Sequence, residues 1–302
     1  MIAKKTLKAA SSQYPIGQPK TLAEWEEKIA LWVKNGAATG AELLVFPEYA
    51  AIEQAACFGP EVYSDLHATL AKVAEIKDAR VQFHVDLAKK YKVHILVGSG
   101  PEKTADGLFV NSAQLVTPKG SVGVQEKLVM TPFEKNWGVT AGKTVRVFET
   151  SIGTFGIAIC YDSEFPLIAR AMAEAGAQVL LVPSCTERVS GYHRVRTGSM
   201  ARALENTIAS VQSPTVGDAP WSPAVDFNAG AAGIYVPSEH GISDTGVLAQ
   251  GVLNAAEWVV AEIDIARLTH LRVSAEMHNF GDWSVQPGAP TPKVDVEVVK
   301  LH

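Results

Sequence analysis

Short apolar segments alternate with segments of helical periodicity along this chain, and the alternation limits the folds that it can adopt. The apolar run Leu43–Phe46 is long enough for a buried strand but not for a helix, and Pro47 ends it. A helical pattern covers residues 22–38, with Thr21 as its expected N-cap. Two apolar runs within residues 108–124 lie close enough together to form a hairpin. We therefore expect an α/β fold in which helices cover a mixed sheet.

The domain organisation predicted from the sequence is one domain over residues 1–280, followed by an extended tail over residues 281–302. Neither a repeat of short period nor a linker divides the first segment, whereas the tail has a loop-like composition with several prolines. Tails of this kind often pack on a neighbouring subunit. The charged, periodic segment 61–91 predicts one long or broken helix, and residues 213–232 predict a surface loop.

Composition and charge exclude several classes of function. The 302 residues are 47% hydrophobic and 20% charged, as in ordinary globular proteins. A formal net charge of -5 without a long basic run argues against nucleic acid or a membrane surface as a partner. No spanning segment or secretory signal is indicated. Three scattered cysteines form no disulfide framework and no zinc-ligand spacing. We expect a cytoplasmic protein without a metal or cofactor.

Three reactive side chains each follow the end of a short apolar strand, namely Glu48, Lys127 and Cys160. In α/β sheets, functional side chains often gather at strand ends. A carboxylate could take the proton of the thiol, and an ammonium would favour both the thiolate and a later oxyanion. The alternative is structural, because a lone cysteine that ends an apolar strand is usually a packing residue.

The sequence contexts of these residues resemble the three signature motifs of the nitrilase (carbon-nitrogen hydrolase) superfamily in order and spacing. The matching segments are Phe46-Pro47-Glu48-Tyr49, the surroundings of Lys127, and Cys160-Tyr161-Asp162-Ser163-Glu164-Phe165-Pro166. Supporting matches are Val110-Asn111-Ser112-Ala113, Val182-Pro183-Ser184 and Arg202-Ala203-Leu204-Glu205-Asn206. The resemblance covers residues 6–265. It implies a four-layer α-β-β-α sandwich, and homodimers or larger homo-oligomers built by face-to-face packing of helices.

The resemblance also implies a role for each motif residue. By motif position, Glu48 would be the general base, Cys160 the nucleophile and Lys127 the cation that stabilises the oxyanion. The backbone N–H of Tyr161 would complete the oxyanion hole. A second glutamate, Glu134, would position substrate or water, although the histidine that usually follows the lysine is absent here. The alternative for Glu134 is a plain surface carboxylate.

Further candidates lie near these motifs. Tyr49 and Tyr161 could contact substrate, and Cys185 could line the pocket wall because it follows a strand end. Cys57 and Cys185 otherwise have structural roles. A buried polar network, rather than catalysis, is expected for the helix residues Arg202, Glu205 and Asn206.

The residues after the nucleophile differ between branches of the superfamily. Cys-Trp-Glu is typical of nitrilases, and arginines soon after the cysteine are typical of N-carbamoyl amino acid hydrolases. Cys-Tyr-Asp resembles the amidase branches. We predict hydrolysis of a non-peptide carbon-nitrogen bond, foremost of a small carboxamide to carboxylate plus ammonia or amine, through a Cys160 thioester. The alternatives are a nitrilase or N-carbamoyl hydrolase on the same triad, an amide acyltransferase, and a non-catalytic interaction protein.

Overall fold

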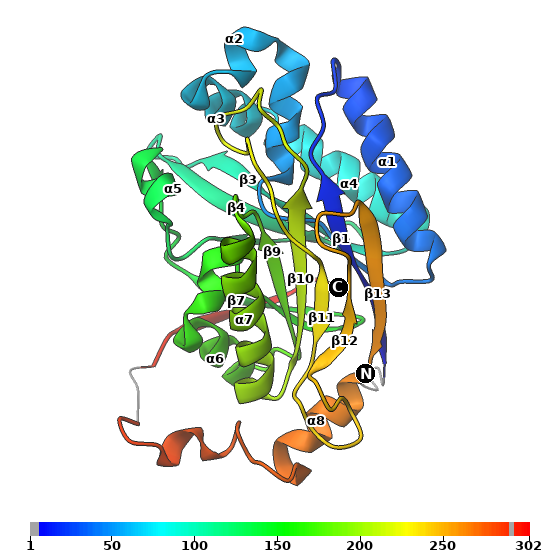
Figure 1. The fold of residues 1–302 in the computed structure, drawn as a ribbon, viewed down its shortest axis with the longest axis vertical. Coiled ribbons are helices and arrows are strands. Elements are labelled where there is room, and N and C mark those ends of the chain that lie inside the picture. The colour runs from blue at the N-terminus through cyan, green and yellow to red at the C-terminus, as the bar shows by residue number, and fades with distance from the viewer. Residues whose placement is uncertain (1–5, 290–292) are drawn as a thin grey trace.

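The strands of the protein join into one network (Figure 1), in a computed structural model that describes residues 6–289 and 293–302. In chain order they are β1 (Leu7–Pro15), β2 (Leu43–Val45), β3 (His94–Lys103), β4 (Phe109–Val116), β5 (Val122–Glu126), β6 (Val139–Thr140), β7 (Val145–Thr150), β8 (Gly153–Ile157), β9 (Val179–Ser184), β10 (Ala209–Val216), β11 (Gly233–Tyr235), β12 (Val247–Gln250), β13 (Glu257–Ile263) and β14 (Val296–Lys300). Neighbours follow the order β14-β7-β8-β9-β10-β1-β2-β3-β4-β5. Off this path, β13 pairs with β1, β11 with β10 and β12, and β6 with β4.

The helices lie between these strands along the chain. They are α1 (Leu22–Ala38), α2 (Pro60–Tyr63), α3 (Leu66–Glu75), α4 (Lys77–Tyr91), α5 (Pro132–Asn136), α6 (Pro166–Glu174), α7 (Val189–Asn206) and α8 (Ile265–Ser274), with 3-10 helices η1 (Ala50–Phe58), η2 (Cys160–Glu164) and η3 (Asp282–Val285). The N-cap prediction for α1 is confirmed, because Thr21 Oγ1 accepts the Glu24 N–H at 3.2 Å. The segment 61–91 is broken into three helices. Within the described ranges, no helix has both the length and the apolarity to cross a membrane.

Strand β1 links two halves of the sheet. Its residues Leu7–Gln13 pair antiparallel with β13, and Ala9–Ser11 pair parallel with β2. At its end, Tyr14 and Pro15 pair parallel with β10. One half therefore contains β13 and β2–β6, and the other contains β7–β12 and β14.

Alternation of side chains along the strands produces the layers. In the segment that contains β2, Leu43 and Val45 belong to the core shared by the two sheet halves, whereas Leu44 and Phe46 pack with α1 and α4. On the other half, α6 and α7 contribute side chains such as Met172 to the core. Figure 1 shows these two helices on the side away from α1 and α4. The order is helices, sheet, sheet, helices, as the resemblance implied.

The C-terminal segment contributes a strand to this sheet. Strand β14 pairs parallel with β7, and the next residue, Leu301, is buried in the core. Before β14, the chain packs on α6 and α8, because the guanidinium groups of Arg170 and Arg272 lie 4.3 and 4.4 Å from the ring centroid of Phe280.

Candidate active site

Glu48 lies just beyond β2, with its side chain almost completely buried. Its Oε1 accepts hydrogen bonds from Lys127 Nζ at 2.7 Å and Asn111 Nδ2 at 3.0 Å. Its Oε2 accepts the backbone N–H of Cys185 at 3.0 Å. Burial raises the pKa of this carboxyl and Lys127 lowers it, while the nearby charge of Glu134 raises it again, so that it ends above its ordinary value. Such a carboxylate suits proton transfer near neutral pH.

Lys127 follows β5 and joins two buried carboxylates. Its Nζ donates to Glu48 Oε1 and to Glu134 Oε2, each at 2.7 Å. Burial alone would lower the pKa of Lys127, but the two carboxylates raise it above its ordinary value. For Glu134 the balance is the opposite, since burial would raise its pKa and Lys127 holds it below the usual range. The cluster is therefore one ammonium shared by two carboxylates.

Local structure fixes Glu134 in this position. It is the third residue of α5, and it forms a reciprocal capping box with Thr131, whose Oγ1 accepts the Glu134 N–H at 3.2 Å. Its Oε1 also accepts the hydroxyl of Tyr49 at 2.8 Å. The side chain is buried, so the alternative of a plain surface carboxylate is wrong.

Asn111 bridges the two carboxylates from the buried strand β4. Its Nδ2 donates to Glu48 Oε1 and Glu134 Oε1, both at 3.0 Å. Its buried Oδ1 has no hydrogen-bond partner among the described residues. In the sequence, Asn111 served only as part of a matching motif and was not predicted as a site residue. An asparagine inside a buried strand is the signal that could have identified it.

Cys160 lies three residues beyond Ile157, the last residue of β8, and it opens η2 with a φ of 49°. This left-handed conformation is uncommon for a residue with a side chain. The thiol is buried, and its Sγ donates to the backbone carbonyl of Cys185 at 3.8 Å. Burial and the charge of Glu48 raise the thiol pKa well above its ordinary value, although Lys127 acts in the opposite direction. The ammonium thus favours the thiolate, as expected, but burial and Glu48 outweigh this effect in the resting protein.

Asp162 connects the turn that contains Cys160 to the segment after Lys127. Its carboxylate accepts backbone N–H groups of Val129 at 2.8 Å and of Leu128 and Ile159 at 3.2 Å. Burial raises the pKa of Asp162 to about 7, although Lys127 and the three N–H groups favour the ionised form. In the sequence this residue indicated only a branch of the superfamily, because two of its three partners, Leu128 and Val129, are 34 and 33 positions away.

The remaining predicted residues differ in how directly they join the cluster. Tyr49 contacts Glu134 through its hydroxyl, and Cys185 contacts both Glu48 and Cys160 through its backbone. Tyr161 is half-buried, with its ring packed edge-on against Phe165 at 4.9 Å between centroids. The predicted polar network on α7 is confirmed by hydrogen bonds and an ion pair among its members Arg202, Glu205 and Asn206.

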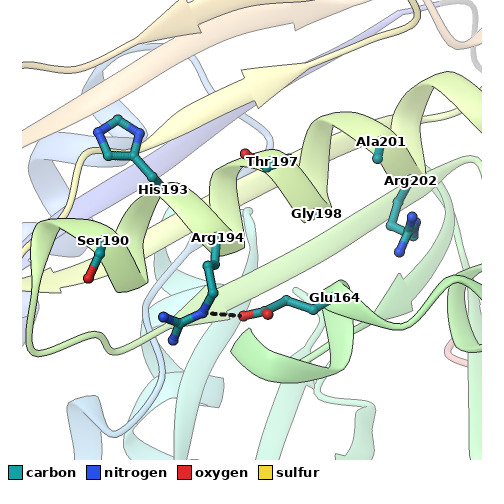
Figure 2. Close-up of a pocket in the computed structure, with 8 residues that line it drawn as sticks. All are labelled: Glu164, Ser190, His193, Arg194, Thr197, Gly198, Ala201 and Arg202. Carbon is teal, nitrogen blue, oxygen red and sulfur yellow. Dashed lines mark ion pairs between the residues drawn. The ribbon is translucent and has the colours of Figure 1, made fainter.

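An open cavity of about 660 Å³ lies along α7, apart from this cluster (Figure 2). Its lining residues are Glu164, Ser190, His193, Arg194, Thr197, Gly198, Ala201 and Arg202. Figure 2 shows Arg194 directed toward Glu164, 3.5 Å away. Because none of Glu48, Lys127 and Cys160 lines this cavity, we do not place the candidate active site there. Over residues 6–289 and 293–302, no group of three or more His, Cys, Asp or Glu side chains could hold a metal ion.

Comparison with known proteins agrees with this geometry. The family model described as carbon-nitrogen hydrolase matches residues 8–272. The chain belongs to the carbon-nitrogen hydrolase family. A probable hydrolase of Bacillus subtilis (strain 168), YhcX, is 33% identical to this carbon-nitrogen hydrolase over 271 residues, which are 89% of this chain and 52% of that protein. The chain thus spans about half the length of that relative.

Two other proteins extend the comparison. The deaminated glutathione amidase of Synechocystis sp. (strain PCC 6803 / GT-S) is 30% identical over 201 residues, covering 62% of this chain and 69% of that protein. The crystal structure of Saccharomyces cerevisiae Nit3, a member of branch 10 of the nitrilase superfamily, superposes with a TM-score of 0.73 at 19% identity. The superposition covers 92% of this chain and 97% of Nit3, and it supports the fold of the carbon-nitrogen hydrolase family.

Proposed function

We propose that this carbon-nitrogen hydrolase is an amidase, which hydrolyses a small carboxamide to a carboxylate and ammonia or an amine. The observation that carries the proposal is the buried cluster in which Lys127 joins Glu48 and Glu134 within reach of the Cys160 thiol. The Cys-Tyr-Asp context of the nucleophile favours amides over nitriles. The similarity to an amidase from Synechocystis is consistent with this choice.

In the first step, Cys160 Sγ attacks the carbonyl carbon of the amide while Glu48 takes the thiol proton. The raised pKa of Glu48 makes it a proton acceptor, and the raised pKa of Cys160 means that the proton leaves during attack rather than before it. An ammonium has three N–H donors, and Lys127 gives two of them to carboxylates. We assign the third to the oxyanion, together with the backbone N–H of Tyr161.

In the second step, the tetrahedral intermediate collapses to a thioester. The C–N bond breaks, and protonated Glu48 gives its proton to the leaving nitrogen. Glu48, again a carboxylate, then takes a proton from water, whose oxygen attacks the thioester carbon. Collapse of this second intermediate breaks the C–S bond and releases the carboxylic acid, which loses its proton to water to become the carboxylate. The proton held by Glu48 returns to the Cys160 thiolate.

Glu134 takes no proton in this scheme. Its pKa lies below the usual range, so it remains a carboxylate throughout. It holds the ammonium of Lys127 and the hydroxyl of Tyr49 in place. We therefore regard it as a positioning residue.

The test is an assay of ammonia release with a panel of carboxamides, nitriles and N-carbamoyl amino acids, combined with mass spectrometry of the trapped enzyme. We expect turnover of carboxamides and an acyl adduct on Cys160. Cys160→Ala should lose the adduct and nearly all activity, because triad members act as a unit. Cys57→Ala is the matched control and should retain both. Turnover of nitriles alone would reject the amidase assignment.

The same experiment distinguishes hydrolysis from acyl transfer. Water and an added amine compete for the thioester, so the ratio of carboxylate to substituted amide in the products reports the preferred acceptor. We expect carboxylate to dominate at millimolar amine. Near-complete transfer to the amine would instead identify an acyltransferase.

A further inference from the structure

A cluster of apolar side chains lies beside the candidate active site and takes no part in the proposed chemistry. Its buried members are Ile16, Tyr49, Ile52, Leu70, Met130, Val139, Ala219 and Val225. Other members are only partly buried and pack against these, namely Leu66, Phe109, Trp137, Cys185, Trp221 and Ala224. We call the two groups together the apolar wall.

The apolar wall is continuous with the catalytic cluster at two points. Tyr49 belongs to both, because it follows Glu48 and its hydroxyl donates to Glu134 at 2.8 Å. Cys185 also belongs to both, since its backbone contacts Glu48 and Cys160. The wall therefore begins next to the nucleophile.

Two tryptophans of the apolar wall, from separate segments of the chain, are only partly buried. Trp137 packs on Tyr49 with 5.8 Å between ring centroids, and Trp221 packs edge-on against Tyr63 at 5.7 Å. Figure 1 shows the loop between β10 and β11, which carries Trp221, beside α2 and α3. Partly exposed apolar surface next to a reactive group is typical of ligand sites, which are mostly apolar with few polar groups.

The segments that carry the apolar wall offer few cations to a substrate, since Lys72 of α3 is paired with Glu75 at 2.7 Å and Lys135 of α5 is exposed. Residues 217–228 contain two aspartates and neither lysine nor arginine. Beyond Cys185, Arg188 lies 3.7 Å from Glu187 and is mostly exposed. Lys127 is already paired with two carboxylates, Glu48 and Glu134. A second carboxylate on the substrate would lose hydration here without gaining a cation.

We propose that the apolar wall binds an apolar, uncharged substituent of the substrate, so that the enzyme selects neutral carboxamides over amides that carry a carboxylate. This inference rests on the proposed amidase function. The wall binds the substituent while Cys160 attacks the amide carbon. In a hydrophobic pocket a single methylene changes kcat/KM by about 10- to 200-fold, so a larger apolar group is a strong determinant of selection.

The first arm of the experiment compares matched substrates on the full-length chain. Pentanamide and glutaramate differ only by exchange of a terminal methyl for a carboxylate. We expect kcat/KM for pentanamide to exceed that for glutaramate by about 10-fold or more. Phenylacetamide should likewise exceed acetamide. Equal or better turnover of glutaramate overturns the inference and leaves the amidase function intact, whereas turnover of nitriles alone overturns the amidase function itself.

The second arm alters the wall. Trp221→Ala should lower kcat/KM for phenylacetamide by about 10-fold or more, mainly through KM, and change that for acetamide by less than about threefold. Trp283→Ala, the same substitution in η3, is the matched control and should change neither. An equal loss for both substrates would show that Trp221 has a structural role only, and would overturn the inference.

A third variant keeps the test decisive if Trp221→Ala fails to fold. Ala224→Arg places a cation beside the partly exposed surface of the wall, and it should raise the glutaramate to pentanamide ratio of kcat/KM by about 10-fold. An unchanged ratio in a folded Ala224→Arg protein contradicts the proposal.

Discussion

Lys127 supplies the positive charge that balances the two buried carboxylates of the site. It is almost completely buried, as are the two carboxylates that it joins. Buried charges persist only when they are paired and hydrogen-bonded. Asn111 adds a further donor to Glu48 and Glu134, which would otherwise repel each other. Besides burial, the pKa of Glu48 depends on Lys127, Glu134 and Cys160.

Substitution Glu134→Gln should separate positioning from chemistry. The charge of Glu134 raises the Glu48 pKa, so its removal should lower that pKa. Glu48 works as a carboxylate, and activity is lost as pH falls through its pKa. The acid limb of the kcat/KM profile should therefore move to lower pH. The lost charged hydrogen bond should also lower kcat by about 10- to 100-fold.

Glu126→Gln is the matched control for this substitution, because Glu126 is adjacent to Lys127 and only partly buried. Its pH profile should coincide with that of the unmodified enzyme. An acid limb that stays in place in Glu134→Gln would show that Glu134 does not act on Glu48.

The raised pKa of Cys160 predicts slow alkylation at neutral pH. Iodoacetamide reacts with the thiolate, which forms only as pH approaches the raised pKa. Labelling of the resting enzyme, followed by peptide mass spectrometry from pH 6 to 10, should show a rate that still rises at the alkaline end. Cys57, whose pKa burial raises to about 11, provides the internal comparison. A plateau for Cys160 near pH 7 would indicate a preformed thiolate instead.

At the scale of elements, two turns carry the reactive groups and a single side chain joins them. The segment after β5 contains Lys127, and η2 begins with Cys160. Asp162 accepts N–H groups from both segments. A shift of either turn would therefore move the ammonium relative to the thiol.

Asp162→Asn should change how stability depends on pH. Burial raises the folded-state pKa of Asp162 to about 7, whereas the pKa of an unfolded aspartate is about 4. Protonated Asp162 therefore adds to the free energy of unfolding. This addition is fully present below about pH 4 and is lost as pH rises through 7. From pH 5 to pH 8, the free energy of unfolding measured with urea should fall for the unmodified protein. It should fall less for Asp162→Asn. Equal falls would contradict the raised pKa.

Strand β14 should depend on one buried side chain. Leu301 is 5% exposed and packs in the core beside β7, whereas Val298 within β14 is 44% exposed. Leu301→Ala should lower the free energy of unfolding by about 2–4 kcal/mol, because it leaves a cavity. Val298→Ala is the control and should change it by less than about 0.5 kcal/mol. Equal effects in urea unfolding would show that β14 does not pack as described.

Across the whole molecule, the sequence predicted the features that have local signals. The alternation of short apolar segments with helical segments identified most strands, whereas the resemblance implied the four layers. The positions of Glu48 and Lys127 after strand ends correctly indicated that they lie together. The bridging role of Asn111 was missed, because its two partners are 63 and 23 residues away along the chain. The raised pKa of the Cys160 thiol could not be predicted, because burial is a property of the assembled fold.

The oligomeric state remains a prediction from the resemblance. Exposed apolar side chains on the outer helices, Leu167 on α6 and both Val189 and Leu204 on α7, are available for packing between copies. We expect a homodimer or larger assembly by light scattering, and Leu204→Glu should reduce its mass. Val273→Glu on α8 is the control at another exposed apolar position. A monomeric unmodified protein would contradict the prediction.

The place of β1 in the sheet has a consequence for biosynthesis. Although β1 is made early, two of its partner strands, β10 and β13, are made only at residues 209–216 and 257–263. Pairing across such a separation is slow, and an unpaired strand edge promotes aggregation in the meantime. The nascent chain therefore has to keep β1 protected until most of the protein has left the ribosome. Refolding from denaturant should accordingly be slow, with a yield that falls as protein concentration rises.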